Sequence, residues 1–366
     1  MMDNLIPNNQ QPTPMIPHSR PTLGQEEIQR VSAVLGSGQL AQGQMAAKFE
    51  AAFARKLKVG YAVSVSSGTA ALHLTLLALK IGPKDEVIIP SYVCSALLNA
   101  VNYVGARPVL AEIDPATYNL DPVDVKNRLT RRTRAIIVPH LFGLAADMEN
   151  LSGLDVPIIE DCAQAAGAVY KQKQVGTQGR AAIFSFYATK VLTTGEGGMI
   201  VSNSKELIQH ARSYRQYDKT DRYQIRFNYK MTDIQAAIGL CQLNRLDNFI
   251  RRRKAIAQNY HKDLASLDMR LPPQESGHIY FRYVIGLGAD ARPWLRGLTA
   301  RGVGCARPVH TPLHRYLEQD GYPITDKAWH ESLSIPIYPS LTEKERAHII
   351  QSLIETSQEV KGANNL

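Results

Sequence analysis

Short apolar runs rich in β-branched residues alternate with helix-like stretches through the first two thirds of the chain. Seven runs follow this rhythm: YAVSVS (61–66), EVIIP (86–90), RPVLAEI (107–113), RAIIVPH (134–140), VPIIED (156–161), AAIFSF (181–186) and GMIVSN (198–203). Most are continuously apolar, which is typical of strands buried on both faces. The pattern predicts an α/β fold with a mostly parallel sheet between two layers of helices.

The length of 366 residues exceeds what a single core usually accommodates, so we expect two domains. A long helix is predicted over residues 232–267, followed by a Pro-richer part with its own strand signal, IYFRYVIGL. Residues 1–15 are rich in Asn, Gln and Pro and are expected to form a mobile tail. We therefore divide the rest into a large domain, 16–250, and a smaller α/β domain, 251–366.

Membrane, secreted and nucleic-acid-binding classes are disfavoured by composition. The chain has neither a long apolar run nor a signal-peptide pattern at its start. Its four cysteines are widely separated and form no CxxC pair, which argues for reduced thiols and a cytoplasmic location. The net charge of +9 is dispersed, with its densest run inside the predicted long helix, so it suits phosphate-bearing small molecules better than nucleic acid.

Ligands of open α/β sheets bind beyond the carboxyl ends of the strands, so the residues just after each run are informative. Ser66 ends the first run, and Ser67, Gly68 and Thr69 follow it before an apolar helix. This arrangement can bind a phosphate or serve as an ordinary turn and N-cap. No Walker sequence or GxGxxG motif is present.

Three further positions after strands suggest one cofactor. Asp161 can pair with a ring nitrogen or cap a helix, Gln164 can bond a phenolic oxygen, and Tyr92 offers an aromatic face for stacking. Lys190 lies in the loop FSFYATKVLTTGEGG, where desolvation would lower its pKa, and Ser185 could add a hydroxyl to a phosphate. Taken together, these groups match the needs of pyridoxal 5′-phosphate (PLP) bound to a lysine as a Schiff base.

Several blocks, in order, resemble the DegT/DnrJ/EryC1/StrS family of PLP-dependent sugar aminotransferases, which have the aspartate-aminotransferase fold (fold type I). The blocks are SSGTAALH, DEVIIPSYV, PHLFGLAADM, IIEDCAQAAGA, FSFYATKVLTTGEGG, NYKMTDIQAAIGLCQL, PLH and LSIPIYPSLT. The resemblance implies that Lys190 and Asp161 are catalytic, and that a homodimer is the active unit. It assigns cofactor contacts to Ser67, Gly68, Thr69, Tyr92, Asp161, Gln164, Ser185, Lys190 and the neighbouring subunit's Asn228, and substrate contacts to His314 and Tyr338.

The sequence departs from the family pattern near the expected substrate side. Lys230 stands where Arg is usual, Gln216 and Tyr217 stand where His-Gly is frequent, and Cys94 replaces a smaller or hydroxylic residue. The pair His310 and His314 has an HxxxH spacing, but Pro312 lies between them and no glutamate follows the first, so we expect no metal.

The resemblance implies transfer of an amino group from an amino acid, with glutamate as the expected donor, to a keto sugar, with a nucleotide-linked keto-hexose as the expected acceptor. Three alternatives remain: a keto cyclitol as acceptor, a PLP sugar dehydratase, and a non-catalytic regulatory or binding protein with the same fold. A dehydratase would be expected to carry histidine at the position of Lys190.

Overall fold

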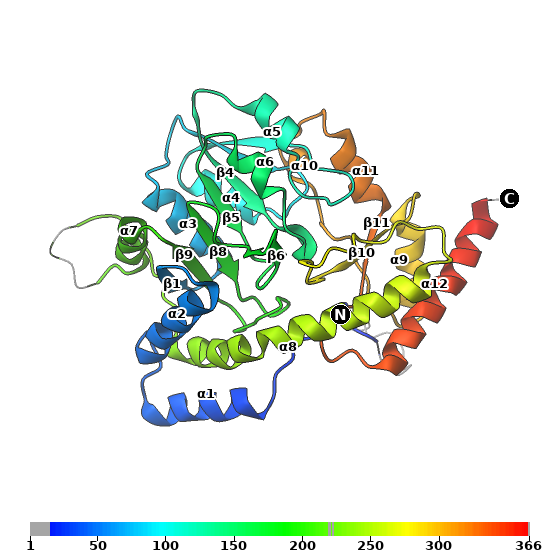
Figure 1. The fold of residues 1–366 in the computed structure, drawn as a ribbon, viewed down its shortest axis with the longest axis horizontal. Coiled ribbons are helices and arrows are strands. Elements are labelled where there is room, and N and C mark those ends of the chain that lie inside the picture. The colour runs from blue at the N-terminus through cyan, green and yellow to red at the C-terminus, as the bar shows by residue number, and fades with distance from the viewer. Residues whose placement is uncertain (1–14, 219–220, 222, 365–366) are drawn as a thin grey trace, which may run out of the picture.

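The computed structural model describes residues 15–218, 221 and 223–364. The predicted tail, 1–15, lies outside the described residues apart from Met15. A seven-stranded sheet forms the centre of the larger part, and helix α8 (Asp233–Leu264) extends from beneath it to the smaller C-terminal part (Figure 1). In the described part of the chain, no helix is long and apolar enough to cross a membrane.

The seven predicted runs all form strands of the large sheet. These are β1 (Tyr61–Val65), β2 (Glu86–Pro90), β3 (Arg107–Ala111), β4 (Thr133–Pro139), β5 (Ile158–Asp161), β8 (Ala181–Ser185) and β9 (Gly198–Ser202). Their order is β1-β9-β8-β5-β4-β2-β3, and only β9 runs antiparallel to its neighbours. The predicted mostly parallel sheet is therefore confirmed, and six strands end at one edge.

Helices bury both faces of this sheet because successive residues of each strand point to opposite sides. In β2, for example, Val87 and Ile89 pack in one apolar cluster while Ile88 packs in another. One face is covered by α3, α4 and α7, and the other by α2, α5, α6 and the first half of α8. Their bounds are α2 (Gln44–Leu57), α3 (Gly68–Ala78), α4 (Ala96–Tyr103), α5 (Pro122–Arg128), α6 (Met148–Ser152) and α7 (Lys205–Arg215).

The second half of α8 belongs to the core of the smaller part. Ile256, Tyr260 and Leu264 pack there against a two-stranded antiparallel sheet and two helices. The predicted boundary between residues 250 and 251 thus falls within a continuous helix, and we retain it as a proposal. The elements of this part are β10 (Tyr283–Gly286), α9 (Ala291–Ala300), α10 (Leu313–Tyr316), α11 (Pro323–Glu331), β11 (Ser332–Ile335) and α12 (Glu343–Asn364).

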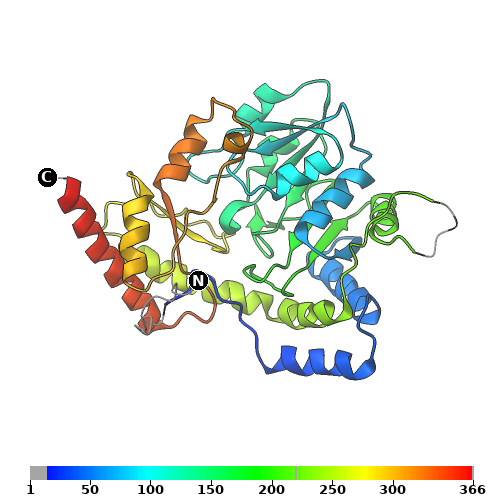
Figure 2. The same ribbon diagram turned by 180° about the vertical axis from the view of Figure 1, so that it is seen from behind.

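The segment before the first helix also joins the smaller part. Ile16 forms a parallel bridge with Val303 and is buried in the C-terminal core. The chain then passes along α8 to reach α1 (Gln25–Ser37), as Figure 2 shows in blue. Residues 16–20 consequently lie beside the C-terminal part, although they come first in the sequence. The remaining elements are the short hairpin β6 (Val169–Tyr170) and β7 (Lys173–Gln174) and the 3₁₀ turn η1 (Leu141–Gly143).

The NYKMTD segment ties the start of α8 to the first strand. Thr232 caps α8 through a capping box with Gln235, and Asp233 accepts hydrogen bonds from the backbone N–H groups of Gly43 (2.7 Å) and Ala46 (3.0 Å) at the start of α2. The carbonyl of Tyr229 accepts from the N–H of Ser66 at 2.8 Å. These bonds fix the turn that follows β1.

Candidate active site

The turn between β1 and α3 has the geometry of an anion site. The side chain of Ser67 caps α3 by accepting a hydrogen bond from the N–H of Ala70 at 3.0 Å, and Ser67 and Thr69 are half-buried. A Cβ on Gly68 would lie 2.8 Å from the Cβ of Ser185, so only glycine leaves room beside that hydroxyl. The predicted phosphate residues are thus brought together at the positive end of a helix dipole.

Asp161 ends β5 in the middle of the sheet and is almost completely buried. Burial raises the pKa of its carboxyl group, although the N–H of Ala163, which it accepts at 2.9 Å, and the charge of Lys190 act in the opposite direction. A cationic partner would stabilise the charged form of this buried carboxylate. The N–H of a protonated pyridine ring fits that requirement.

Gln164 lies three residues further along the chain, and its amide orientation is determined by a single contact. Its Oε1 accepts a hydrogen bond from the backbone N–H of Phe142 at 2.9 Å. The amide nitrogen is therefore directed elsewhere and can donate to a phenolic oxygen. The contact of Gln164 with the cofactor stays a prediction.

Lys190 follows β8 in a loop and is half-buried. Its ammonium group lies 5.2 Å from the centroid of the Phe281 ring. Burial lowers the pKa of Lys190, while Cys94 and Asp161 oppose this shift and Arg282 adds to it. A lysine with a lowered pKa is a better nucleophile at neutral pH. The structure thus places Lys190 and Asp161 in one site, as the sequence indicates.

Tyr92 does not offer the open aromatic face that the sequence suggests. The residue exposes none of its surface, its hydroxyl donates to the carbonyl of Ala328 at 3.4 Å, and its ring packs 5.8 Å from that of Tyr118. A cofactor ring cannot stack on a side chain that is enclosed on all sides. Cys94, two residues later, is exposed and lies close enough to Lys190 to affect its pKa, after the larger effect of burial.

The two residues assigned to the substrate are also enclosed. The ring nitrogens of His314 bond the hydroxyl of Ser91 (2.7 Å) and the carboxylate of Asp326 (3.2 Å), and the ring stacks on Tyr322. Tyr338 has no exposed surface and packs in the C-terminal core. In this conformation both side chains are enclosed, and the substrate contacts that the resemblance assigns to them stay predictions.

Asn228 differs from these residues because it is exposed. The neighbouring Phe227 and Tyr229 are anchored, since their rings stack with centroids 5.1 Å apart and the hydroxyl of Tyr229 lies 3.3 Å from Nδ1 of His73. The departures Lys230 and Tyr217 also lie here, with the ammonium group of Lys230 5.5 Å from the centre of the Tyr217 ring. The anchored neighbours Phe227 and Tyr229 thus hold the backbone in place, and the side chain of Asn228 is exposed to solvent.

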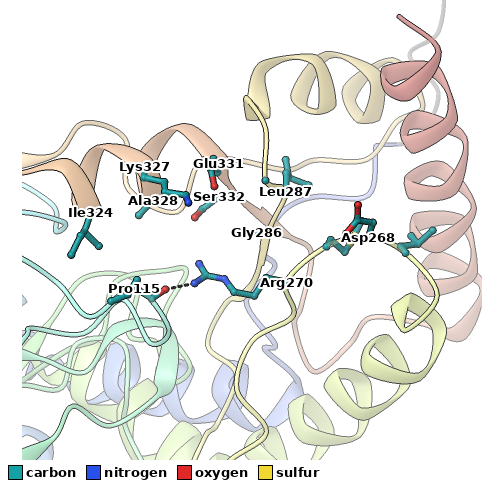
Figure 3. A pocket seen from close by; sticks show the side chains of 13 residues that line it. Pro115, Asp268, Arg270, Gly286, Leu287, Ile324, Lys327, Ala328, Glu331 and Ser332 are labelled. Carbon is teal, nitrogen blue, oxygen red and sulfur yellow. Dashed lines mark hydrogen bonds between the residues drawn. The ribbon is translucent and has the colours of Figure 1, made fainter. Parts of the chain in front are cut away.

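A separate pocket of about 620 Å³ lies at the junction of the two parts of the chain (Figure 3). Arg270 points into this junction, where it donates to the carbonyl of Pro115 and the hydroxyl of Tyr118. None of the predicted cofactor residues lines the pocket. We therefore place the active site at Lys190 and not here.

Among the residues that the structure describes, two groups have ligand types that suit a metal. His310 is exposed whereas His314 is buried between Ser91 and Asp326, so the HxxxH pair forms no common ligand face. His140, Glu160 and Cys162 lie close together and buried, but Glu160 is already bonded by His140 and by three backbone N–H groups.

Comparison with known proteins gives matches along nearly the whole chain. The model of the DegT/DnrJ/EryC1/StrS aminotransferase family matches residues 21–354. GDP-perosamine synthase of Escherichia coli O157:H7 is 37% identical over 93% of this chain and 98% of its own length. The putative sugar aminotransferase Spr1654 of Streptococcus pneumoniae has the same fold. Its PMP form gives a TM-score of 0.92 at 25% identity, covering 96% of this chain and 100% of that one.

A second structure of Spr1654, in the PLP form, gives a TM-score of 0.90 at 25% identity and covers 94% of this chain and 99% of that one. The expected fold is confirmed by these matches.

Proposed function

Since the chain belongs to the DegT/DnrJ/EryC1/StrS family of PLP-dependent aminotransferases, we propose that it transfers an amino group from glutamate to a nucleotide-linked keto-hexose. The observation that carries this proposal is the meeting of Lys190 and Asp161 in one site. They come from the loop after β8 and the end of β5, and each affects the pKa of the other after the dominant effect of burial. A cofactor with an aldehyde and a basic ring nitrogen needs an amine to bind the aldehyde and a carboxylate to pair with the ring nitrogen.

The chemistry that PLP supplies when bound is a ring that accepts electrons from the carbon next to the reacting nitrogen. The carboxylate of Asp161 would hold the proton on the ring nitrogen, and the amide nitrogen of Gln164 would donate to the phenolic oxygen. The half-exposed turn of Ser67, Gly68 and Thr69, together with the Ser185 hydroxyl, holds the phosphate. The ε-amino group of Lys190 would move the proton at the reacting carbon.

The nucleotide-linked acceptor is supported by relatives and by charge. GDP-perosamine synthases from two bacteria are 37% and 38% identical to this chain. The net charge of +9 favours an acceptor that carries a diphosphate. Fold alone would not support this choice, because one fold serves many substrates.

A homodimer with shared sites is part of the same proposal. Asn228 is exposed on an anchored segment and is available to a phosphate bound in the neighbouring subunit. Large apolar side chains near it are also exposed, namely Tyr217 (53%), Tyr223 (96%) and Ile225 (69%). Side chains of this kind are frequently covered by a second subunit.

A cytoplasmic location also belongs to the proposal, because the four cysteines are free thiols.

The test is a product assay with purified protein, PLP and glutamate. Nucleotide-linked 3-keto- and 4-keto-hexoses are offered in parallel with inososes, and the products are identified by mass spectrometry. We expect an amine to replace the ketone of a nucleotide sugar, with one 2-oxoglutarate formed per amine. Amination of inososes alone would favour the cyclitol alternative. Absence of any amine with both classes, from protein that binds PLP, would contradict the proposed acceptors.

A further inference from the structure

Arg282 brings a positive charge into the active site without a carboxylate to balance it. Its guanidinium carbon lies 5.0 Å from the centroid of the Phe281 ring, the same ring that Lys190 approaches at 5.2 Å. In the part of the chain that the structure describes, no aspartate or glutamate forms an ion pair with Arg282. Burial lowers its pKa to about 10, the direction expected for a guanidinium removed from water without an anion beside it.

A second buried guanidinium adds to this excess of charge. Arg253 exposes 2% of its surface, and burial, with a smaller contribution from the charge of Arg282, lowers its pKa to about 9. Its Nη1 donates to the carbonyls of Tyr280, Phe281 and Ile337, at 3.3, 3.2 and 2.9 Å. The segment that carries Arg282 is thus held by a cation, and the local charge favours an anion.

The orientation of Arg282 is fixed by the N-terminal segment. Its Nη1 donates to Nδ1 of His18 at 2.8 Å, and Nε2 of His18 lies 2.8 Å from the hydroxyl of Ser334. Burial and the charge of Arg282 lower the pKa of His18 to about 3, so His18 is a neutral acceptor at physiological pH. Among the described residues, no hydrogen bond uses Nη2 of Arg282. One side of the guanidinium is therefore held while the other can bind a ligand.

The backbone places Arg282 on the Gln164 side of the site, away from the phosphate turn. The N–H of Arg282 donates to the carbonyl of Phe142 at 3.3 Å, and the N–H of Phe142 donates to Gln164 at 2.9 Å. The phosphate turn lies instead between β1 and α3, beside Ser185. An anion at Arg282 is thus a different group from the cofactor's phosphate.

The chemistry of the reaction identifies that anion. The amine of an amino donor must reach the position held by the amine of Lys190, and its carboxylate is bonded to the carbon that carries that amine. A cation near Lys190 and apart from the phosphate is therefore suited to bind this carboxylate. We propose that Arg282, oriented by His18, binds the α-carboxylate of the amino donor, an inference that rests on the proposed function.

The test compares Arg282→Leu and Arg282→Lys with a matched control, Arg270→Leu. Arg270 also lies over an aromatic ring in this part of the chain, 4.7 Å from the centroid of Tyr118, but outside the active site. The visible absorption band of lysine-bound PLP is recorded first for each protein. We expect it to be retained in all three variants, which shows that they fold and bind the cofactor.

Two measurements then test whether Arg282 contacts the donor's carboxylate. The rate of the glutamate half-reaction at low donor concentration should fall roughly 10- to 100-fold in Arg282→Leu and less in Arg282→Lys, while a primary amine without a carboxylate reacts at the wild-type rate. Calorimetry should show that 2-methylglutarate, which has no amine to react, binds the wild type and Arg270→Leu more tightly than Arg282→Leu.

Two results would overturn the assignment. Wild-type glutamate rates and 2-methylglutarate binding in Arg282→Leu would show that Arg282 contacts no donor carboxylate. A loss confined to the keto-sugar half-reaction would assign Arg282 to the acceptor instead. Failure of the proposed function is distinguishable from either, because the wild-type protein would then show no PLP band or no reaction with glutamate.

Discussion

Glu160 and His140 are joined by a hydrogen bond of 3.1 Å between Oε2 and Nε2, and neither side chain has any exposed surface. Nδ1 of His140 accepts from the N–H of Ala146 at 3.0 Å, so Nε2 carries the hydrogen that Glu160 accepts. Burial alone would raise the pKa of Glu160, but the bonds from His140, Gly176 and Gly179 together lower it. Glu160 precedes Asp161 in β5 and the backbone N–H of His140 donates to the carbonyl of Asp161 at 3.1 Å, so this pair supports the strand end that carries Asp161.

Replacing Glu160 with glutamine should destabilise the protein without abolishing the site. The N–H groups of Gly176, Gln178 and Gly179 all donate to Glu160, at 2.7, 2.7 and 2.6 Å, and a glutamine side chain offers them only one oxygen. We expect the free energy of unfolding in urea to fall by about 2–4 kcal/mol. Glu149→Gln, which alters an exposed pair with Lys171, is the control and should be almost neutral. Equal stability of the two variants would contradict this role of Glu160.

Asp161→Asn should separate cofactor binding from turnover. Asparagine preserves the shape and can still accept from the N–H of Ala163, so the visible band with PLP should persist. The neutral amide no longer holds a proton on the ring nitrogen, and kcat should fall at least about 100-fold. Near-normal kcat in this variant, measured with glutamate and any active acceptor, would refute the role of Asp161.

Gly68→Ala should weaken PLP binding by closing the space next to Ser185. The new Cβ would meet the Cβ of Ser185 at 2.8 Å, and overpacking of this kind should raise the dissociation constant roughly 10- to 100-fold. Gly36→Ala is the matched control, because a Cβ there meets nothing within 4 Å. Equilibrium dialysis with PLP measures both. Identical dissociation constants for the two variants would exclude Gly68 from the phosphate turn.

The lowered pKa of Lys190 predicts the pH dependence of covalent PLP binding. Only the neutral amine is nucleophilic, so the rate of band formation should rise with pH and level off once the amine is deprotonated. Because burial lowers the pKa of Lys190, the midpoint should fall below the ordinary value of 10.5. Free Nα-acetyllysine treated with PLP is the reference. A midpoint equal to that of the reference would show that burial has no such effect.

The sheet could be predicted from the sequence because it depends on local pattern. All seven apolar runs form strands, while the roles of Lys190, which follows one of them, and of Asp161, which ends another, stay predictions. The long helix also begins one residue after the predicted start, where Thr232 caps it. In these cases the chain alone specifies which residues are buried and where an element ends.

The direction of side chains beyond a strand end could not be predicted. After β2 the chain leaves the two-residue alternation, so the sequence could not tell that Tyr92 faces the core while Cys94 faces the site. The enclosure of His314 depends on Asp326 of the next helix and on Ser91, which is 223 residues away in the sequence. One available signal was missed: Arg282 is the only charged residue of the IYFRYVIGL run, and a charge within an apolar strand is informative.

The most direct test of the central claim is the absorption spectrum of the purified protein with PLP, before and after glutamate, beside that of Lys190→Ala. We predict a visible band in the wild type that glutamate converts to the shorter-wavelength band of the aminated cofactor, and no such band in the variant. A wild-type protein without the band, or an unchanged band in Lys190→Ala, would contradict the assignment of Lys190 and the mechanism built on it.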